Sequence, residues 1–262
     1  MFKFKQFTIH QDRTAMKVGT DGVLLGAWAP VSPNAQRLLD IGTGTGLIAL
    51  MLAQRLINSQ CKMQNAKSIP TNHLSIIVNC ALNITAIDID QPSIEQATEN
   101  IKNSPFAKYI TTHHTSLQDH NPQEKYDAII CNPPYFVASL KCPDAQRTQA
   151  RHTDSLSFDD LLQHSARLLN DGGSLSVILP ITEGNQLIEL APKYGLTLTH
   201  LTEVHPTPTA PPKRLLLQFI MHNSQLNHSS SLISHSSLTI EIARHQYTPE
   251  YIALTRDFYL KI

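Results

Sequence analysis

The chain has no apolar run of ~20 residues, the length that a helix needs to cross a bilayer, so we expect no membrane-spanning segment. Its first residues do not form an apolar leader with a small-residue cleavage site, which argues against secretion. Charged residues make up only 16% of the chain, and 21 Lys and Arg balance 21 Asp and Glu. This balance argues against a bulk polyanion binder but allows a local basic patch. We expect a soluble, cytoplasmic protein.

The sequence also lacks the spacings that bind metal ions. None of the 13 histidines stands in an H-E-x-x-H or zinc-finger arrangement. The four cysteines have no C-x-x-C spacing, so we expect free thiols in a reducing compartment: Cys61, Cys80, Cys131 and Cys142. We therefore expect no bound metal, and a monomer.

The chain does contain a regular alternation of short apolar runs and amphipathic stretches, which is typical of a parallel sheet with helices on both faces. The apolar runs predict strands at 37–42, 84–89, 110–116, 126–131, 174–179, 196–203 and 214–221. Helices are expected at 47–56, 92–103 and 158–169, from near 184, and after a Thr248-Pro249-Glu250 cap. The predicted fold class is α/β, with a doubly wound, Rossmann-like, seven-stranded and mostly parallel sheet.

We expect one domain at 37–262, preceded by a short N-terminal segment at 1–36. Two insertions interrupt the pattern. The first, 58–82, is long and polar, with a candidate short strand at Ile76-Ile77-Val78. The second, 222–237, is rich in Ser, Asn and His, which predicts a flexible surface excursion before a candidate edge strand at 238–243. Asp171-Gly172-Gly173 is expected to end the helix that precedes the fifth strand.

A glycine loop follows the first strand, in the run Asp40-Ile41-Gly42-Thr43-Gly44-Thr45-Gly46. Its glycines, Gly42, Gly44 and Gly46, allow positive φ and the close approach of a ligand, and the helix behind them begins with unpaired N–H donors. A dinucleotide enzyme would hold a pyrophosphate there. The Asp40 carboxylate would repel a pyrophosphate but suits the cationic amino acid end of S-adenosylmethionine.

Asp88, at the end of the second strand, is placed to accept hydrogen bonds from ribose hydroxyls. It lies about 40 residues beyond the loop, where the Rossmann pattern has about 20. The segment 58–82 absorbs this difference if it is an insertion. The alternative is that the glycines only turn the chain and that Asp88 caps the next helix.

Asn132-Pro133-Pro134-Tyr135 follows the fourth strand, at the edge where open α/β sheets bind ligands. The exocyclic amine of a base is a poor nucleophile because its lone pair is delocalised into the ring. The Asn132 side-chain oxygen and the Pro133 carbonyl are placed to accept both amine N–H bonds, and Tyr135 offers a stacking face. The alternative is a strand-ending turn with Tyr135 in the core.

With these motifs the chain resembles the class I S-adenosylmethionine-dependent amino-methyltransferases. Further stretches resemble the bacterial tRNA (adenine-N6)-methyltransferases that act on valine tRNA, and the similarity spans nearly the whole chain. These stretches are 4–7, 12–13, 15–22, 24–30, Pro143, 146–151 and 251–260.

The resemblance implies S-adenosylmethionine as cofactor and the adenine on the 3′ side of the anticodon, adenosine 37, as target. It implies that Asp40, Gly42, Gly44 and Asp88 hold the cofactor. It also implies that 17–22 closes over it, with contacts from Lys17, Gly19, Thr20 and Asp21. Ser116 stands where relatives often place an aspartate on the cofactor's adenine ring, so a weaker bond is expected there.

Arg147 and Arg151, just beyond the Asn-Pro-Pro-Tyr motif, are the first candidates for tRNA contacts, with Lys5 and Arg13 in the N-terminal segment. Both pairs equally suit a solvated surface or local ion pairs. Lys213-Arg214, after a proline cluster, is a third candidate.

The predicted function is methylation of adenine N6 in tRNA. Several alternatives stay open: a guanine-N2 rRNA methyltransferase, a protein glutamine-N5 methyltransferase, a DNA adenine methylase, a NAD-dependent oxidoreductase and a catalytically silent RNA-binding module. The glutamine enzymes normally carry a helical N-terminal domain, whereas only about 40 residues precede the glycine loop. The guanine enzymes more often have Phe at the position of Tyr135.

Overall fold

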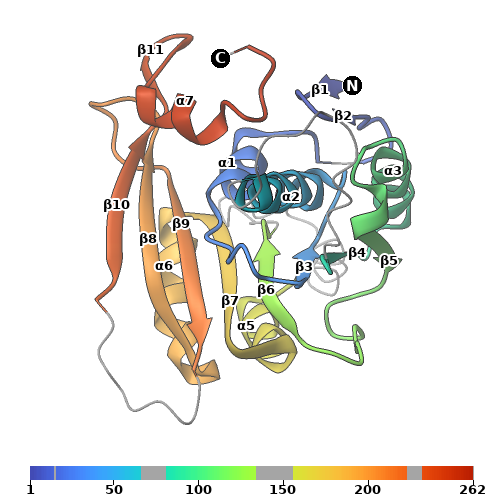
Figure 1. The fold of residues 1–262 in the computed structure, drawn as a ribbon. Helices are drawn as coiled ribbons and strands as arrows, with labels where there is room; N and C mark the ends of the chain where they lie inside the picture. The colour runs from blue at the N-terminus through green and yellow to red at the C-terminus, as the bar shows by residue number, and fades with distance from the viewer. Residues whose placement is uncertain (15, 66–80, 134–155, 223–231, 262) are drawn as a thin grey trace, which may run out of the picture.

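The computed structural model describes residues 1–14, 16–65, 81–133, 156–222 and 232–261. They form an eight-stranded sheet in the order β10-β8-β9-β7-β6-β3-β4-β5 (Figure 1). Strand β9 is antiparallel to both of its neighbours, and the other pairings in this sheet are parallel. The strands are β3 (Arg37–Ile41), β4 (Asn83–Asp88), β5 (Ile110–His114), β6 (Tyr126–Cys131), β7 (Leu169–Pro180), β8 (Leu196–His205), β9 (Arg214–Met221) and β10 (Ser234–Thr239).

Helices cover both faces of the sheet, and each face has its own hydrophobic core. Because side chains alternate along a strand, Leu38 and Leu39 of β3 belong to different cores. The predicted doubly wound α/β class is confirmed. One face carries α1 (Thr20–Trp28), α2 (Leu47–Asn65), α3 (Gln91–Lys102) and α7 (Pro249–Thr255), and the other carries α5 (Phe158–Leu168), α6 (Ile181–Leu190) and the 3-10 turn η2 (Ala191–Tyr194).

The prediction of seven strands was one short, because β10 joins the sheet beside β8. It pairs with β8 from Ser234 to Thr239, within and just beyond the stretch predicted to be a flexible excursion. Of its side chains only that of Leu238 is buried, so the sequence has no apolar alternation that would predict a strand here. Backbone pairing with β8 and a hydrogen bond between the Ser236 and Thr202 hydroxyls hold it in the sheet. The edge strand predicted at 238–243 therefore begins four residues earlier, at Ser234, and ends at Thr239. Residues Glu241–Ala243 instead form β11, in a hairpin with β12 (Gln246–Tyr247).

Three further boundaries differ from the sequence-based expectations. Helix α2 runs to Asn65, into the predicted insertion, and the candidate strand at 76–78 lies outside the described residues. Helix α5 leads directly into β7, so 171–173 lies within the strand, beside a shift of the β6–β7 register. Helix α6 begins at Ile181, before the expected start near 184. The predicted cap of the last helix is confirmed, since the Thr248 hydroxyl accepts a hydrogen bond from the Tyr251 N–H at 3.2 Å.

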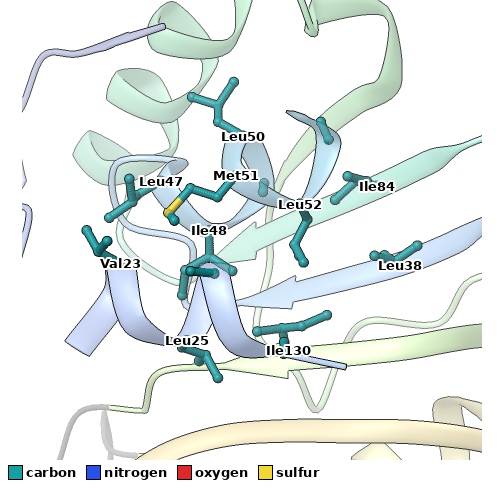
Figure 2. Close-up of a cluster of buried hydrophobic side chains, with 14 of the residues drawn as sticks. Val23, Leu25, Leu38, Leu47, Ile48, Leu50, Met51, Leu52, Ile84 and Ile130 are labelled. Atoms are coloured by element: carbon teal, nitrogen blue, oxygen red, sulfur yellow. The ribbon is translucent and has the colours of Figure 1, made fainter. Parts of the chain in front are cut away.

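The N-terminal segment packs onto the sheet unit. Its strands β1 (Phe2–Lys3) and β2 (Thr8–Ile9) form a hairpin, and the Lys5 N–H donates to the carbonyl of Phe258 near the other end of the chain, at 2.8 Å. Helix α1 packs closely on α2, and Figure 2 shows Val23 of α1 beside Leu47 and Met51 of α2. A Cβ on Gly26 would lie 2.8 Å from the sulfur of Met51. Among the described residues, no helix is long and apolar enough to cross a membrane.

Candidate active site

A cavity of 1010 Å³ opens at the carboxyl ends of β3, β4 and β6. Its walls come from residues 16–22, from the glycine loop and from the residues that follow β4, β5 and β6. Strand β3 lies between β4 and β6, so the chain reverses its direction of winding at this point of the sheet. Open α/β sheets bind their ligands in the crevice at such a switch point. The cavity is large enough for a nucleoside-sized cofactor.

The glycine loop presents its backbone to this cavity. Gly42 and Gly44 adopt φ values of 65° and 55°, and a Cβ on Gly42 would meet nothing within 4 Å. The Thr43 N–H donates to the carbonyl of Ile87 at 3.0 Å, and the Gly44 N–H donates to the Asp88 carboxylate at 2.9 Å. The loop is therefore tied to β4 while its open side faces the space where a ligand fits.

Gly46 does not have the cofactor-binding position expected for it. It is absent from the cavity lining, and a Cβ there would lie 3.4 Å from atoms of Ala97 and Ile101 in α3. Its φ of 81° and its tight packing both favour glycine. Gly46 thus lets α3 approach the loop.

Asp40, another predicted cofactor contact, is also not among the residues that line the cavity. It shares the face of β3 that Leu38 buries beneath α2, and it is 0% exposed. Its Oδ2 accepts from the Thr43 hydroxyl at 2.7 Å and from the Ala49 N–H at 3.2 Å. Asp40 therefore holds the loop and the first turn of α2 from behind.

Burial is the main cause that raises the pKa of Asp40, to about 7. The bonds from Thr43 and Ala49 act in the opposite direction, and the charge of Asp88 raises the pKa further. Its Oδ1 has no hydrogen-bond partner among the described residues. Burial, followed by the charges of Asp40 and Asp88, also raises the pKa of the adjacent Cys131 thiol, which stays neutral.

Asp88, the predicted ribose-binding residue, lines the cavity. Its Oδ2 accepts from the Gly44 N–H, and its Oδ1 accepts from the Asp90 N–H at 3.0 Å. Each carboxylate oxygen can accept a further bond from a hydroxyl group. The alternative that Asp88 caps α3 is wrong, because Asp90 is the cap and accepts from the Ser93 N–H at 3.0 Å.

Ser116 lies in the cavity wall next to Leu117. Its hydroxyl donates to the Asp119 carboxylate at 2.6 Å and accepts from the Asp119 N–H at 3.0 Å. Only one acceptor position of this hydroxyl remains for a ligand. The wall also includes Ile89, which sequence reasoning missed. It is 54% exposed directly after a buried strand, and this exposed apolar side chain is the signal that marks it.

Asn132 lines the cavity at the end of β6, and its side-chain oxygen is buried without a hydrogen-bond partner among the described residues. A buried acceptor without a donor is rare in folded proteins and costs about 1–3 kcal/mol. A ligand N–H in the cavity would supply the missing donor. Pro133 is buried behind it, whereas Pro134 and Tyr135 lie outside the described residues.

The N-terminal segment forms a further wall of the cavity, with the residues that were predicted to close over the cofactor. Lys17, Gly19, Thr20 and Asp21 all line the cavity. The Lys17 ammonium donates to the carbonyls of Gln11, at 2.5 Å, and Thr14, at 3.0 Å, and Asp21 forms an ion pair with Arg214 of β9 at 2.8 Å. These charges hold the segment in place.

Of the predicted tRNA contacts, Lys5, Arg13 and Lys213 lie within the described residues. The Lys5 ammonium donates to the carbonyl of Arg256 at 2.6 Å, and Arg13 pairs with Glu99 of α3 at 3.0 Å. Neither lines the cavity. Arg147 and Arg151 lie outside the described residues, and Lys213 is exposed at the cavity edge of the sheet. The described residues contain no group of three side chains that could hold a metal ion.

The residues that line the cavity have the chemical groups that S-adenosylmethionine would need. The Gly42 backbone borders open space, the Asp88 carboxylate can accept hydroxyl bonds, and Ile89 and Leu117 offer apolar surface for a purine ring. The unpartnered Asn132 oxygen borders the same cavity. A donor cofactor and an amine acceptor would therefore meet in one space.

Comparisons with known proteins agree with this geometry. Residues 73–186 match the family model described as Methyltransferase small domain. The chain is 47% identical to the tRNA1(Val) (adenine(37)-N6)-methyltransferase of Parabacteroides distasonis over 263 residues, which cover 100% of this chain and 98% of that protein. It is 45% identical to the protein of the same name from Phocaeicola vulgatus over 261 residues, with coverage of 100% and 98%.

Among solved structures, a predicted O-methyltransferase from Agrobacterium tumefaciens has a TM-score of 0.63 and 19% identity. The match covers 91% of this chain and 96% of that one. At this level of identity it shows the fold alone.

Proposed function

Since this chain belongs to the family of tRNA1(Val) (adenine(37)-N6)-methyltransferases, and so is a methyltransferase, we propose that it methylates N6 of adenosine 37 in valine tRNA. The observation that carries the proposal is the Asn132 side-chain oxygen, which is buried at the cavity wall and accepts no hydrogen bond from any residue that the structure describes. An adenine amine has two N–H groups, and one of them supplies a donor. A tRNA substrate fits a protein of the cytoplasm, and we propose that it acts as a monomer.

S-adenosylmethionine would supply a methyl group on a positively charged sulfur. Asn132 Oδ1 and the carbonyl of Pro133 accept the two amine hydrogens, which turns the nitrogen lone pair toward the methyl carbon. The same two oxygens would stabilise the positive charge that develops on nitrogen as the carbon–nitrogen bond forms and the methyl–sulfur bond breaks, with S-adenosylhomocysteine as the leaving group. The methylated amine then loses a proton readily to solvent, so a strong general base is not required.

The cofactor is proposed to lie along the cavity with its ribose hydroxyls on Asp88. Ile89, Leu117 and Ser116 would hold its adenine ring, and the backbone of Gly42 would hold its amino acid end. Lys17–Asp21 would cover it from the N-terminal side. Asp40 contributes indirectly, because it holds the loop that forms the floor.

The RNA side is proposed to be bound by Arg147, Arg151 and Lys213. Lys5 and Arg13 stay untested as RNA contacts, and their charged groups already have partners within the protein. Strand β8 is parallel to β6, so Lys213, between β8 and β9, lies at the cavity edge. A cation there is positioned to meet phosphates that flank the target base.

The test is mass spectrometry of nucleosides from unmodified valine tRNA after incubation with S-adenosylmethionine. Wild-type protein should produce N6-methyladenosine, and Asn132→Ala should lose at least a hundredfold in kcat. Calorimetry should show that this variant still binds S-adenosylhomocysteine. Asn34→Ala, at the opposite edge of the sheet, is the control and should keep full activity.

Methyl groups found on guanine or on protein glutamine would contradict the proposal. So would full activity of Asn132→Ala. Preferential binding of NAD over S-adenosylhomocysteine would overturn the choice of cofactor.

A further inference from the structure

One buried amide in α3 joins the two chain segments that carry separate walls of the cavity. Asn100, in the last turn of the helix, is 1% exposed. Its Nδ2 donates to the carbonyls of His10, at 2.8 Å, and Thr45, at 2.9 Å. Its Oδ1 accepts from the His10 N–H at 2.9 Å. Both N–H groups of the amide are therefore used on two different segments.

These two segments carry separate walls of the cavity. Thr45 lies in the glycine loop, between two glycines of positive φ. His10 precedes Gln11, whose side-chain oxygen accepts from the Val18 N–H at 2.8 Å and whose carbonyl accepts from Lys17. Val18 and Lys17 line the cavity, whereas Asn100, His10 and Gln11 do not. A side chain outside the cavity thus fixes the distance between the glycine loop and the N-terminal segment.

We infer that Asn100 is a positioning residue for cofactor binding. It holds the glycine loop against the segment that begins at His10, so that both walls are in place before the cofactor arrives. Binding to walls that are already ordered avoids the entropy cost of ordering them. The inference rests on the proposed function, because it takes this cavity as the S-adenosylmethionine site. Loss of the link should weaken cofactor affinity and leave the chemical step at Asn132 nearly unchanged.

The decisive variant is Asn100→Asp, which keeps the size of the side chain and the acceptor for the His10 N–H. It replaces both N–H donors with an oxygen that faces the carbonyls of His10 and Thr45. The matched control is Gln96→Glu. Gln96 lies one turn earlier in α3, is also 1% exposed, and accepts from the Arg13 N–H at 3.4 Å. Its side chain therefore contacts the N-terminal segment, and among the described residues it forms no hydrogen bond with the glycine loop.

The measurement is the Kd for S-adenosylhomocysteine by calorimetry at pH 8 and pH 6, together with kcat and KM for the cofactor. Asn100→Asp should raise the Kd about tenfold at pH 8, roughly the effect of one lost hydrogen bond. The Kd should recover partly at pH 6, because a protonated carboxyl can donate to one of the carbonyls. Its kcat at saturating cofactor should stay within about twofold of wild type. Gln96→Glu should bind like wild type at both pH values.

A wild-type Kd for Asn100→Asp overturns the inference, and so does an equal loss in Gln96→Glu, which would indicate general destabilisation of α3. If Asn100→Asp does not fold, Asn100→Ser replaces it, because it removes the reach to both partners without adding a charge. Wild-type affinity in Asn100→Ser overturns the inference in the same way.

Hydrogen exchange gives a readout that is independent of activity. S-adenosylhomocysteine should slow exchange of the His10 amide in wild type, although His10 does not line the cavity, and this protection should be absent in Asn100→Ser. Equal protection in both proteins overturns the inference alone. Wild-type protein that does not bind S-adenosylhomocysteine overturns the proposed function as well.

Discussion

The buried carboxyl of Asp40 should make the stability of the protein fall as pH rises from about 5 to 7. Its pKa is about 7 in the folded chain, against 3.8 for an ordinary aspartate. Between these two values the unfolded chain has lost the proton and the folded chain keeps it, so raising the pH favours unfolding. The contribution is present below the unfolded pKa and is lost as pH rises through the folded one.

The magnitude follows from the size of the shift. Each pH unit in this window removes about 1.4 kcal/mol, so Asp40 accounts for roughly 2–3 kcal/mol between pH 5 and pH 7. Above pH 7 the folded carboxyl is also ionised, and the effect levels off. Asp40→Asn does not ionise and should lack this slope.

The assay is urea unfolding of wild type and Asp40→Asn at pH 5, 6 and 7. Asp127→Asn is the control, because hydrogen bonds from Gln36, Arg37 and Asn170 lower the pKa of Asp127 despite its partial burial. The stability that Asp127 contributes is lost only as pH falls below 3.8 toward its folded pKa, so this variant should keep the wild-type slope from pH 5 to 7. Parallel stability curves for wild type and Asp40→Asn would refute the reasoning.

Three other changes test the packing, the loop and the RNA side. Gly26→Ala should destabilise the protein by about 1–3 kcal/mol in urea, because the new methyl overlaps Met51; unchanged stability would mean that the helices separate freely. Gly42→Ala should lower the free energy of unfolding by roughly 1–2 kcal/mol, because alanine is strained at a φ of 65°. It should also lower the affinity for S-adenosylhomocysteine in calorimetry, because the new methyl group enters the cavity. An unchanged affinity would place the cofactor elsewhere. Lys213→Glu should lower tRNA affinity in filter binding and reduce the salt slope by about 1, whereas Lys108→Glu, before β5 at the opposite edge, should change neither.

Local pattern determined the elements that surround the site. The alternation of apolar runs and amphipathic stretches predicts β3, β4, α3 and β6 close to where the structure has them, and it predicts the start of α2 but not its end. The periodicity of apolar side chains can be recognised within a few residues, and it shows that the strands are buried on both faces of the sheet. The positive φ values of Gly42 and Gly44 also follow from sequence, because glycine has no Cβ to exclude them. The place of Asn132 directly after β6 follows from where the apolar run of that strand ends.

Tertiary structure decided what each of these residues faces. Asp40 and Gly46 stand in the same motif as Gly42, but α2 covers the first and α3 packs on the second, and neither contact is visible in the motif. Strand β10 exists because β8 has a free edge to pair with, which a Ser-rich sequence does not reveal. Asn100 joins residues 90 and 55 positions away in the chain. Such contacts depend on how elements pack across long sequence separations, so no pattern within one element can encode them.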